Sequence, residues 1–467
     1  MRRFIQEWGP GILILLAICL ALFPLMVRTM NGDPLVPGSE SYYNLRIAHQ
    51  IKEDFTMDYD QLQQRPYNMN LYHYILAVLL FISPSDSLLL ILSVMLSFST
   101  AFLLFGSLAR LKTDRVLSFI ITAVYLLSPL YIYVTTTITA YSVIIFLLVL
   151  SFYLFAKKLS VWSIMPAALT ILIEPSAFLV FLAVLLTYCY YTQKGYREVG
   201  LGFLAGIVIG LIGMTFNYQA VFSLTGGLNP SYYTTDFGAT IGYSFFTLLL
   251  AATAIIIHWK TGMKAKMVHI FMVMLVIFST LSQNSRLVMN CVLCVYSGMA
   301  IYFFMKRAWV VPVLRDLTLL VIMSSLLFSS ISFTSRTSDM EPIADTLKAL
   351  YEISLIDSEG AVLSTPENGY IIEYFAGKPA YLDELSQIYS DYTRKRTEYQ
   401  EIISSRSPEL TKKLLKGEEI DFIYFDPKTI TVFEQQNSGL LLVLEHSENF
   451  INLASFRGRQ SWLYISI

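Results

Sequence analysis

The sequence predicts a polytopic α-helical membrane protein with a C-terminal α/β domain on the extracytoplasmic side. Hydrophobic residues make up 55% of its 467 residues and charged residues only 14%, whereas an ordinary soluble domain has about 25% charged residues. Apolar segments recur up to residue 334, and charged residues return from about residue 335. The net charge of −1 argues against a nucleic-acid partner, because binding to phosphates needs a basic surface.

Eleven apolar segments are predicted to span the membrane, because a spanning helix needs about 17–25 mostly apolar residues. The first segment is long and more spans follow it, so we interpret it as an uncleaved span and not as a signal peptide. Segment 71–82 is shorter and is predicted to lie on the membrane surface as an interfacial helix. The predicted spans are 10–27, 87–108, 116–134, 142–156, 159–173, 176–193, 199–216, 241–257, 267–281, 287–305 and 316–333.

The distribution of Lys and Arg predicts the orientation, because cytoplasmic loops are richer in both residues. If the N-terminus lies in the cytoplasm, every second loop contains Lys or Arg. The alternate short loops around 128–141, 173–176 and 217–240 contain neither, and the loop at 282–286 contains only Arg286. The pattern therefore predicts a cytoplasmic N-terminus, a long external first loop at 28–86 and an extracytoplasmic C-terminus.

The tail at 335–467 has the pattern of a small folded domain. Short apolar runs in "GAVLST", "DFIYFDP" and "SWLYISI" predict strands. The stretches "RKRTEYQEIISS" and "PELTKKLLKGEE" predict helices, the second with Pro in its first turn. Strands that alternate with helices indicate an α/β domain, and a tail of this length is long enough to bury a core of its own.

The polar parts of the predicted membrane region lie on its outer face, in the first loop, the loop at 217–240 and the terminal domain. Mid-span positions are nearly free of charge, whereas a channel or transporter places its polar groups inside the spans. The sequence therefore predicts a site at the outer membrane surface, where a water-soluble partner meets a lipid-borne one.

Two stretches resemble motifs of a known superfamily. Residues 40–46 read E-S-Y-Y-N-L-R, and residues 362–370 read V-L-S-T-P-E-N-G-Y, with Asp383 further on. In layout and in these letters the chain resembles the GT-C superfamily of polyprenyl-linked-sugar glycosyltransferases, and most of all the catalytic subunit of oligosaccharyltransferase. That family carries a D-P-x-F-N-Y-R motif in its first external loop and a V-L-S-W-W-D-Y-G-Y stretch in its tail.

The resemblance implies a membrane glycosyltransferase. Such an enzyme moves a sugar or oligosaccharide from a polyprenyl-(di)phosphate carrier to an extracytoplasmic acceptor, which is a protein, a lipid or a glycan. It works among membrane lipids, and the resemblance also implies a divalent cation, Mg²⁺ or Mn²⁺.

Two departures from the family pattern leave other functions open. The second external segment, "SPLYIYVTTTITAY", has no acid where the family has an acidic metal motif, and Thr-Pro-Glu replaces the W-W-D core. A catalytically inactive scaffold or binding subunit is therefore the alternative function. A transporter of lipid-linked sugars is disfavoured by the shortage of charge within the spans.

The first loop carries four predicted site residues. Glu40 is the predicted catalytic residue, since a carboxylate can take a proton from an acceptor or hold a divalent cation; the alternative is a solvated loop acid. Arg46 is expected to pair with Glu40 or to orient the loop, because Arg forms bidentate contacts with carboxylates; the alternative is a lipid-headgroup anchor. Asn44 and Tyr43 complete the predicted substrate-binding set, although Tyr is also common at membrane interfaces without any function.

Three further candidates lie near outer span ends. Asp236 resembles the acid of an external T-I-x-E motif in the family and is expected to contact the metal or the acceptor; the alternative is a helix N-cap. Arg286 would bind the donor phosphate, since Arg is always charged, or anchor lipid headgroups. Glu174 precedes Pro175 and would line the site, unless it is an ordinary turn acid.

Overall fold

The computed structural model describes residues 2–111, 113–157, 161–214, 233–259, 262–435 and 439–464. By their contacts, the residues form two compact units. The helical unit contains Met1–Val27, Asn68–Ile75 and Ser83–Ser338, and the mixed unit contains Arg28–Tyr67, Leu76–Ile82 and Asp339–Ile467. The mixed unit thus combines the segment after the first span with the C-terminal tail.

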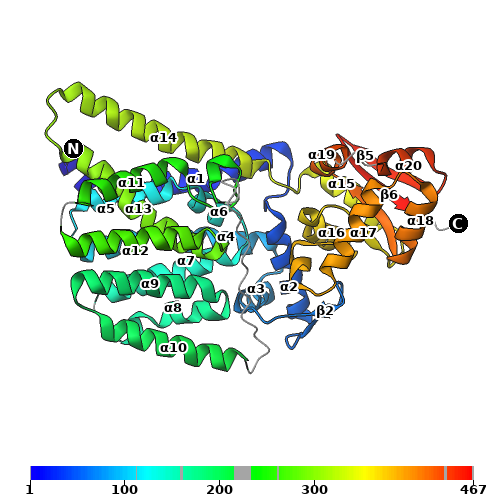
Figure 1. Cartoon of the computed structure of the whole chain (residues 1–467), viewed down its shortest axis with the longest axis horizontal. Helices are drawn as coiled ribbons and strands as arrows, with labels where there is room; N and C mark the ends of the chain where they lie inside the picture. Colours follow the sequence, from blue (N-terminus) through cyan, green and yellow to red (C-terminus); the bar gives the residue numbers. More distant parts are fainter. Residues whose placement is uncertain are drawn as a thin grey trace. The chain divides into compact units, whose positions relative to one another are not determined.

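In the described parts of the chain, six helices are long and apolar enough to cross a membrane, and seven spans result if one bent helix pair counts as a span. The chain is therefore an integral, polytopic membrane protein. Within the helical unit, α9 packs against α10, α12 and α13 (Figure 1). The six helices are α1 (Arg2–Asn31), α4 (Asp86–Arg110), α9 (Pro175–Thr192), α10 (Tyr196–Met214), α13 (Gln283–Lys306) and α14 (Pro312–Ser338).

The remaining predicted spans are shorter or broken. Helices α7 (Ala140–Ala156), α11 (Phe245–His258) and α12 (Met263–Ser279) have 17, 14 and 17 residues. The described part of segment 159–173 is interrupted: α8 (Met165–Leu169) lies between the 3₁₀ turns η1 (Val161–Ser163) and η2 (Thr170–Leu172). The count of eleven spans stays a prediction.

The predicted span 116–134 is bent. It consists of α5 (Arg115–Leu126) and α6 (Pro129–Thr136), whose axes differ by 59°. The break falls at "SP": the Ser128 hydroxyl accepts a hydrogen bond from the Tyr131 N–H at 3.3 Å, and Pro129 opens the new helix. Serine is a favoured N-cap and proline is favoured at the first helical position, so these two residues start a second helix at this point.

The predicted first loop is largely structured. It contains α2 (Ser39–Glu53), a small hairpin of β1 (Tyr59–Asp60) and β2 (Arg65–Pro66), and α3 (Leu71–Ile82). The helix predicted at 71–82 is confirmed, and its place on the membrane surface stays a prediction. Gly38 precedes α2 with φ of 86°, a conformation that glycine adopts without steric cost.

Arg28 ties this first segment to the beginning of the tail. Its side chain is completely buried, and it donates hydrogen bonds to the carbonyl oxygens of Pro34, Met340 and Pro342 at 2.6, 2.7 and 2.6 Å. The Gly38 N–H adds a bond to the Glu341 carbonyl at 2.8 Å. Residues on either side of the helical unit in the sequence are therefore joined within the mixed unit.

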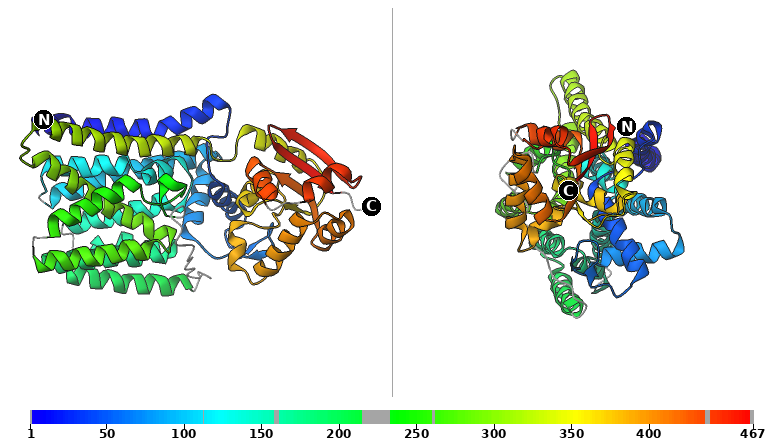
Figure 2. Two further views of the ribbon diagram at one scale, coloured as in Figure 1. Left: turned by 45° about the horizontal axis from the view of Figure 1, so that its top comes forward. Right: turned by 90° about the vertical axis from the view of Figure 1, so that its right-hand side faces the viewer.

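The tail folds around a four-stranded mixed sheet with the order β3-β4-β6-β5, in which β3 and β4 are parallel and the other pairs antiparallel. Figure 2 shows β5 and β6 side by side, in red. The strands are β3 (Ala361–Leu363), β4 (Ile420–Phe425), β5 (Phe450–Phe456) and β6 (Arg459–Tyr464). The helices are α15 (Ala344–Ser354), α16 (Gly369–Phe375), α17 (Tyr392–Ser404), α18 (Pro408–Gly417), α19 (Pro427–Gln435) and α20 (Leu440–His446).

The strands predicted in "GAVLST", "DFIYFDP" and "SWLYISI" and the two predicted helices are confirmed, except that residues 465–467 lie outside the described part. Strand β4 is buried on both faces, with Phe422, Ile423 and Phe425 fully inaccessible, which explains its continuous apolar run. Strand β3 leads through the 3₁₀ turn η6 (Pro366–Asn368) directly into α16. This short connection places α16 against α2.

Candidate active site

The stretch "SESYYNLR" is the beginning of α2 and not an irregular loop. Glu40 lies in its first turn, where the helix dipole favours a negative charge. Glu40, Tyr43 and Asn44 have the i, i+3, i+4 spacing that places side chains on one helix face. Glu40 is half-buried and Asn44 is buried. The predicted catalytic acid is therefore presented by a rigid element.

The two stretches that resemble family motifs meet in the mixed unit. The ring of Tyr43 packs against the ring of Tyr370, with centroids 4.8 Å apart and planes inclined by 36°. One position earlier, Tyr42 packs against Tyr374 at 5.1 Å and against Phe375 at 4.9 Å. Aromatic pairs at such distances add to the stability gained from burial, so these contacts fasten α2 to α16.

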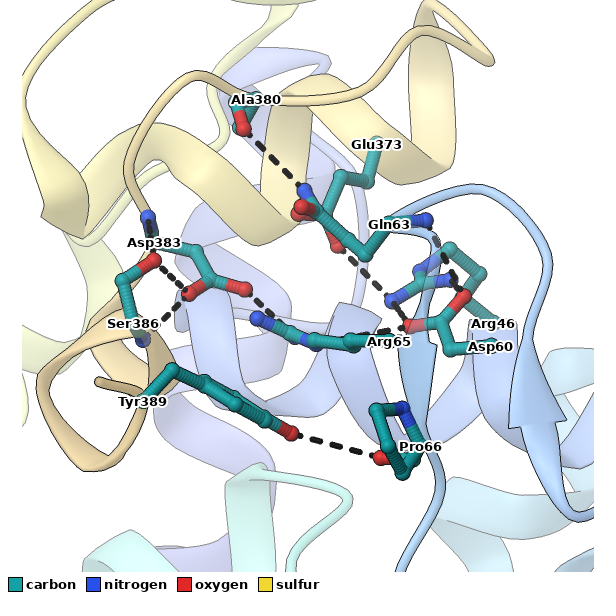
Figure 3. Close-up of polar contacts among 10 residues, drawn as sticks. All are labelled: Arg46, Asp60, Gln63, Arg65, Pro66, Glu373, Ala380, Asp383, Ser386 and Tyr389. Carbon is teal, nitrogen blue, oxygen red and sulfur yellow. Dashed lines mark hydrogen bonds and ion pairs between the residues drawn. The ribbon is translucent and has the colours of Figure 1, made fainter. Parts of the chain in front are cut away.

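Five charged side chains form a continuous chain beside these rings, which we call the charge chain (Figure 3). Arg46 donates from Nη1 and Nη2 to the two oxygens of Asp60 at 2.7 and 2.8 Å, and its Nη2 lies 2.9 Å from Oε2 of Glu373. Arg65 Nη2 lies 2.6 Å from Oδ2 of Asp383, and Arg65 Nε lies 3.9 Å from Oδ2 of Asp60. The order of contacts is Glu373, Arg46, Asp60, Arg65, Asp383.

Further hydrogen bonds hold the ends of the charge chain. The Gln63 amide donates to Glu373 and to the Ala380 carbonyl, the latter at 3.2 Å. At the other end, Oδ1 of Asp383 accepts from the Ser386 N–H at 2.7 Å and from the Ser386 hydroxyl at 2.6 Å. These partners come from the hairpin and from the segment after α16, so the charge chain joins three parts of the mixed unit.

The charge chain is buried, and it contains three carboxyl groups for two guanidinium groups. None of its side chains is more than 10% exposed. Burial raises the pKa of Glu373 to about 8, against the opposing effect of Arg46. Burial also raises the pKa of Asp60, but the hydrogen bond and charge of Arg46, with the charge of Arg65, outweigh this effect and hold that pKa below its ordinary value. Burial therefore favours the protonated form of Glu373, whereas Arg46 and Arg65 favour the ionised form of Asp60.

The prediction that Arg46 pairs with Glu40 is wrong. Six residues along a helix turn a side chain by about 240° relative to the first, and Arg46 is bonded to Asp60 and Glu373 instead. Sequence reasoning missed Asp60, Arg65 and Glu373. A signal was present in the oppositely charged Asp60 and Arg65, which lie close together within the predicted first external loop.

The acid-free segment that was predicted to be the second external one contains a run of buried threonines. The hydroxyls of Thr135, Thr136 and Thr137 each donate to a carbonyl oxygen three or four residues earlier, at distances of 2.7 to 3.2 Å. These side chains satisfy the backbone of α6. They offer hydroxyl oxygens but no carboxylate for an ion.

Asp236 accepts two hydrogen bonds near the start of α11. Its Oδ2 accepts from the Phe245 N–H at 2.6 Å, and its Oδ1 accepts from the Ser329 hydroxyl at 2.6 Å. Asp236 thus satisfies a backbone N–H at the start of α11 from outside the helix, whereas the N-cap residue itself is Ser244. Among the described residues, moreover, no group of three or more His, Cys, Asp or Glu side chains is placed to hold a metal ion. The implied Mg²⁺ or Mn²⁺ site therefore stays a prediction.

The starts of α9 and α13 lie close together in the helical unit. Glu174 directly precedes α9, and Arg286 lies near the start of α13. Arg286, in the first turns of α13, is buried and donates to the carbonyls of Ile241 and Thr280 at 3.0 and 2.8 Å. Glu174 accepts from the Ser176 hydroxyl at 2.8 Å, and Ser176 lies 3.3 Å from the hydroxyl of Ser282, the N-cap of α13. Burial raises the pKa of Glu174 to about 7, against the effect of Ser176.

The predicted site residues thus fall into two groups. Glu40, Tyr43, Asn44 and Arg46 lie on α2 in the mixed unit, and Asp236, Glu174 and Arg286 lie in the helical unit.

Comparison with known proteins identifies the fold. By sequence, neither a family model nor a curated protein matches the chain. By structure, the chain has the fold of GT-C glycosyltransferases, as its sequence motifs suggested.

Among the similar solved structures is the Archaeoglobus fulgidus oligosaccharyltransferase in its apo form, with a TM-score of 0.66, 10% identity and coverage of 96% of this chain and 73% of that one. Another is the archaeal oligosaccharyltransferase AglB from Archaeoglobus fulgidus with an inhibitory peptide and a dolichol-phosphate (TM-score 0.65, 10% identity, 98% and 74% covered). A third is ArnT from Cupriavidus metallidurans bound to undecaprenyl phosphate (TM-score 0.56, 13% identity, 98% of both chains covered).

Proposed function

We propose that the chain is a membrane glycosyltransferase that moves a sugar or oligosaccharide from a polyprenyl-(di)phosphate carrier to an extracytoplasmic acceptor. One observation carries the proposal: the two stretches that resemble the motifs of such enzymes, far apart in the sequence, pack against each other through Tyr43 and Tyr370. The shared GT-C fold supports it. The solved relatives hold dolichol-phosphate and undecaprenyl phosphate, which favours a polyprenyl carrier.

Glu40 acts on the acceptor in this proposal. Sugar transfer needs an acceptor that is deprotonated or oriented, and a carboxylate presented by a rigid helix can accept its proton. Tyr43 and Asn44 lie on the same face of α2 and would contact the sugar or the acceptor. Arg46 supports the helix through Asp60 and Glu373 rather than touching the substrate.

Arg286 acts on the donor. A leaving phosphate needs a positive partner at the membrane surface, and a guanidinium group stays charged there. Glu174, at the adjoining helix start, would line the same region. No step proposed for these residues requires a metal ion.

The orientation is part of the proposal. The N-terminus lies in the cytoplasm, and the first external segment and the tail from about residue 335 lie on the extracytoplasmic side. The alternation of Lys and Arg along the loops supports this arrangement.

A catalytically inactive scaffold or binding subunit is the second candidate. The acid-free threonine segment and the hydrogen bond from the Phe245 N–H to Asp236 favour it. The two candidates are separated by incubating membranes that contain the chain, or its Glu40→Gln variant, with a radiolabelled polyprenyl-diphosphate sugar. An enzyme transfers label only with Glu40 present. A protein that retains the donor without transferring any label is a binding subunit.

A further inference from the structure

We infer that Glu373 is a positioning residue, which together with Asp60 clamps Arg46 and so fixes the orientation of the α2 face that carries Glu40. The inference rests on the proposed function for its catalytic consequence, but not for the clamp itself. Nothing in the sequence motifs assigns a role to Glu373.

The clamp follows from the contacts of a single guanidinium group. Arg46 meets both oxygens of Asp60 in a bidentate pair and meets Glu373 through the same Nη2. Bidentate pairs fix direction as well as distance. Asp60 belongs to the hairpin and Glu373 to α16, so rotation of α2 about its axis would break a contact on one side or the other.

Aromatic packing alone leaves α2 more freedom. The pairs Tyr43–Tyr370 and Tyr42–Phe375 are tilted contacts at 4.8 and 4.9 Å, and such packing tolerates sliding better than a bidentate ion pair does. A buried salt bridge is weak evidence for added stability, but it can specify one geometry among several. We therefore infer that the charge chain fixes the orientation of α2, and that the aromatic contacts hold α2 against α16.

The clamp is sensitive to the charge of Glu373. The charged groups that face Glu373 are Arg46 from α2, Asp60 and Arg65 from the hairpin, and Asp383 from the segment after α16. With Glu373 ionised, three negative charges face two positive ones in a buried place. When α2 separates from α16, Glu373 meets water and its pKa returns towards the ordinary value of 4.5.

The sign of the pH effect follows from this difference. Between about pH 4.5 and 8 the docked state keeps a proton on Glu373 that the separated state loses, so rising pH weakens docking across this window. Below this window Glu373 is protonated in both states, and above it Glu373 is ionised in both states. Outside the window the docking equilibrium therefore no longer depends on pH through Glu373. The variant Glu373→Gln resembles the protonated form and should show none of this dependence.

The test measures access to a buried position on α2. Ala48 is completely buried, and Ala48→Cys is introduced into the full-length protein after the four native cysteines have been replaced. The labelling rate by a thiol reagent is measured from pH 5 to pH 8 with Glu373 and with Glu373→Gln. Because the thiol itself reacts faster at high pH in both proteins, only the ratio of the two rates is used.

We expect the ratio to rise by about two orders of magnitude across this range, and Ser461→Cys in the buried core of β6 to show a constant ratio. At pH 6, Glu373→Ala should label Ala48→Cys faster than Glu373→Gln does. A ratio that stays flat, or an Ala variant that labels no faster than the Gln variant, would overturn the clamp.

Activity provides the second arm of the test. At pH 8 the transfer rate of Glu373→Gln should exceed that of the unchanged protein, and at pH 5 the two should be equal, with the KM for the donor unchanged. Equal rates at both pH values would remove the catalytic consequence. If Glu40→Gln transfers label normally while the labelling ratio still rises, the proposed function fails and the clamp remains.

Discussion

Arg46 and Glu373 lie 2.9 Å apart, on two helices that stand far apart in the sequence. The contact is one of several between α2 and α16, and it lies beside the Tyr43–Tyr370 pair. Segment 40–46 and segment 362–370 resemble motifs of the same family of enzymes, and each is fastened to the other in this structure. The mixed unit is therefore where the proposed acceptor chemistry is built.

Replacing Glu40 by Gln should lower the rate of sugar transfer by about two orders of magnitude or more, because general-base assistance contributes about 10²–10⁴-fold. The fold and donor binding should persist, since the amide keeps the shape of the side chain. Glu40→Asp should be milder, because it retains the charge. The measurement is transfer from a radiolabelled lipid-linked sugar in membranes, with donor binding measured in parallel. Undiminished transfer by Glu40→Gln would leave α2 as a purely structural helix.

Replacing Arg286 by Ala should weaken donor binding before it affects the rate of transfer from bound donor. It should also lower the melting temperature, because two buried hydrogen bonds to the carbonyls of Ile241 and Thr280 are lost, at about 0.5–1.5 kcal/mol each. Arg286→Lys is the matched control, since it keeps the charge and loses the planar fork. A lower melting temperature with unchanged donor affinity in Arg286→Ala would make the residue structural only.

Replacing Asp236 by Ala should destabilise the protein by about 1 kcal/mol or more, because the hydrogen bonds from the Phe245 N–H and the Ser329 hydroxyl are lost, at about 0.5–1.5 kcal/mol each. Asp236→Asn keeps one acceptor oxygen and should recover most of this loss, with transfer unaffected in either variant. The melting temperature and the rate of sugar transfer are measured for both variants and for the unchanged protein. A stable Asp236→Asn protein without activity would mean that the carboxylate acts in the reaction after all.

Treatment with a mild chelator should leave most of the transfer activity. The predicted second external segment has no acid, and among the described residues no group of three or more potential ligands is gathered. A divalent ion held by few carboxylates keeps more of its waters and binds loosely. Assays with and without chelator provide the measurement. Complete loss of activity that micromolar manganese restores would contradict this expectation.

The orientation is tested by cysteine labelling in intact cells, in a background without the native cysteines. Lys194 follows α9 and Lys428 lies in the tail, and both side chains are exposed. Lys428→Cys should react with an impermeant reagent, and Lys194→Cys should react only after the cells are opened. The reverse result would invert the predicted topology.

Sequence reasoning recovered the parts of the fold that local pattern controls. Helix α18 has a Pro in its first turn and strand β4 has a continuous apolar run, and each was located from its own residues. The break between α5 and α6 was missed because the apolar stretch continues through Ser128 and Pro129. Apolar composition shows that a segment can lie in a membrane, but it does not show where a helix ends. Here the N-cap Ser128 and Pro129 determine where the second helix begins.

The candidate site was harder to predict because its partners are remote. Nothing near Arg46 in the sequence identifies Asp60 as its bidentate partner, and nothing in "GYIIEYF" marks Glu373 as anything but a helix acid. Helical geometry alone would have excluded Glu40 as the partner of Arg46, had segment 39–53 been taken as a helix. Partner choice in a buried charge chain depends on how distant segments dock, which a single sequence does not reveal.

The mixed unit draws its residues from both sides of the helical unit in the sequence, at Arg28–Tyr67 and Asp339–Ile467. During synthesis, α2 and the hairpin leave the ribosome long before α16 exists. The ion pairs of Arg46 with Glu373 and of Arg65 with Asp383 therefore cannot form until the intervening helices have been synthesised. Contacts between such distant segments form late, so the proposed site can assemble only after the chain has been translated beyond Asp383.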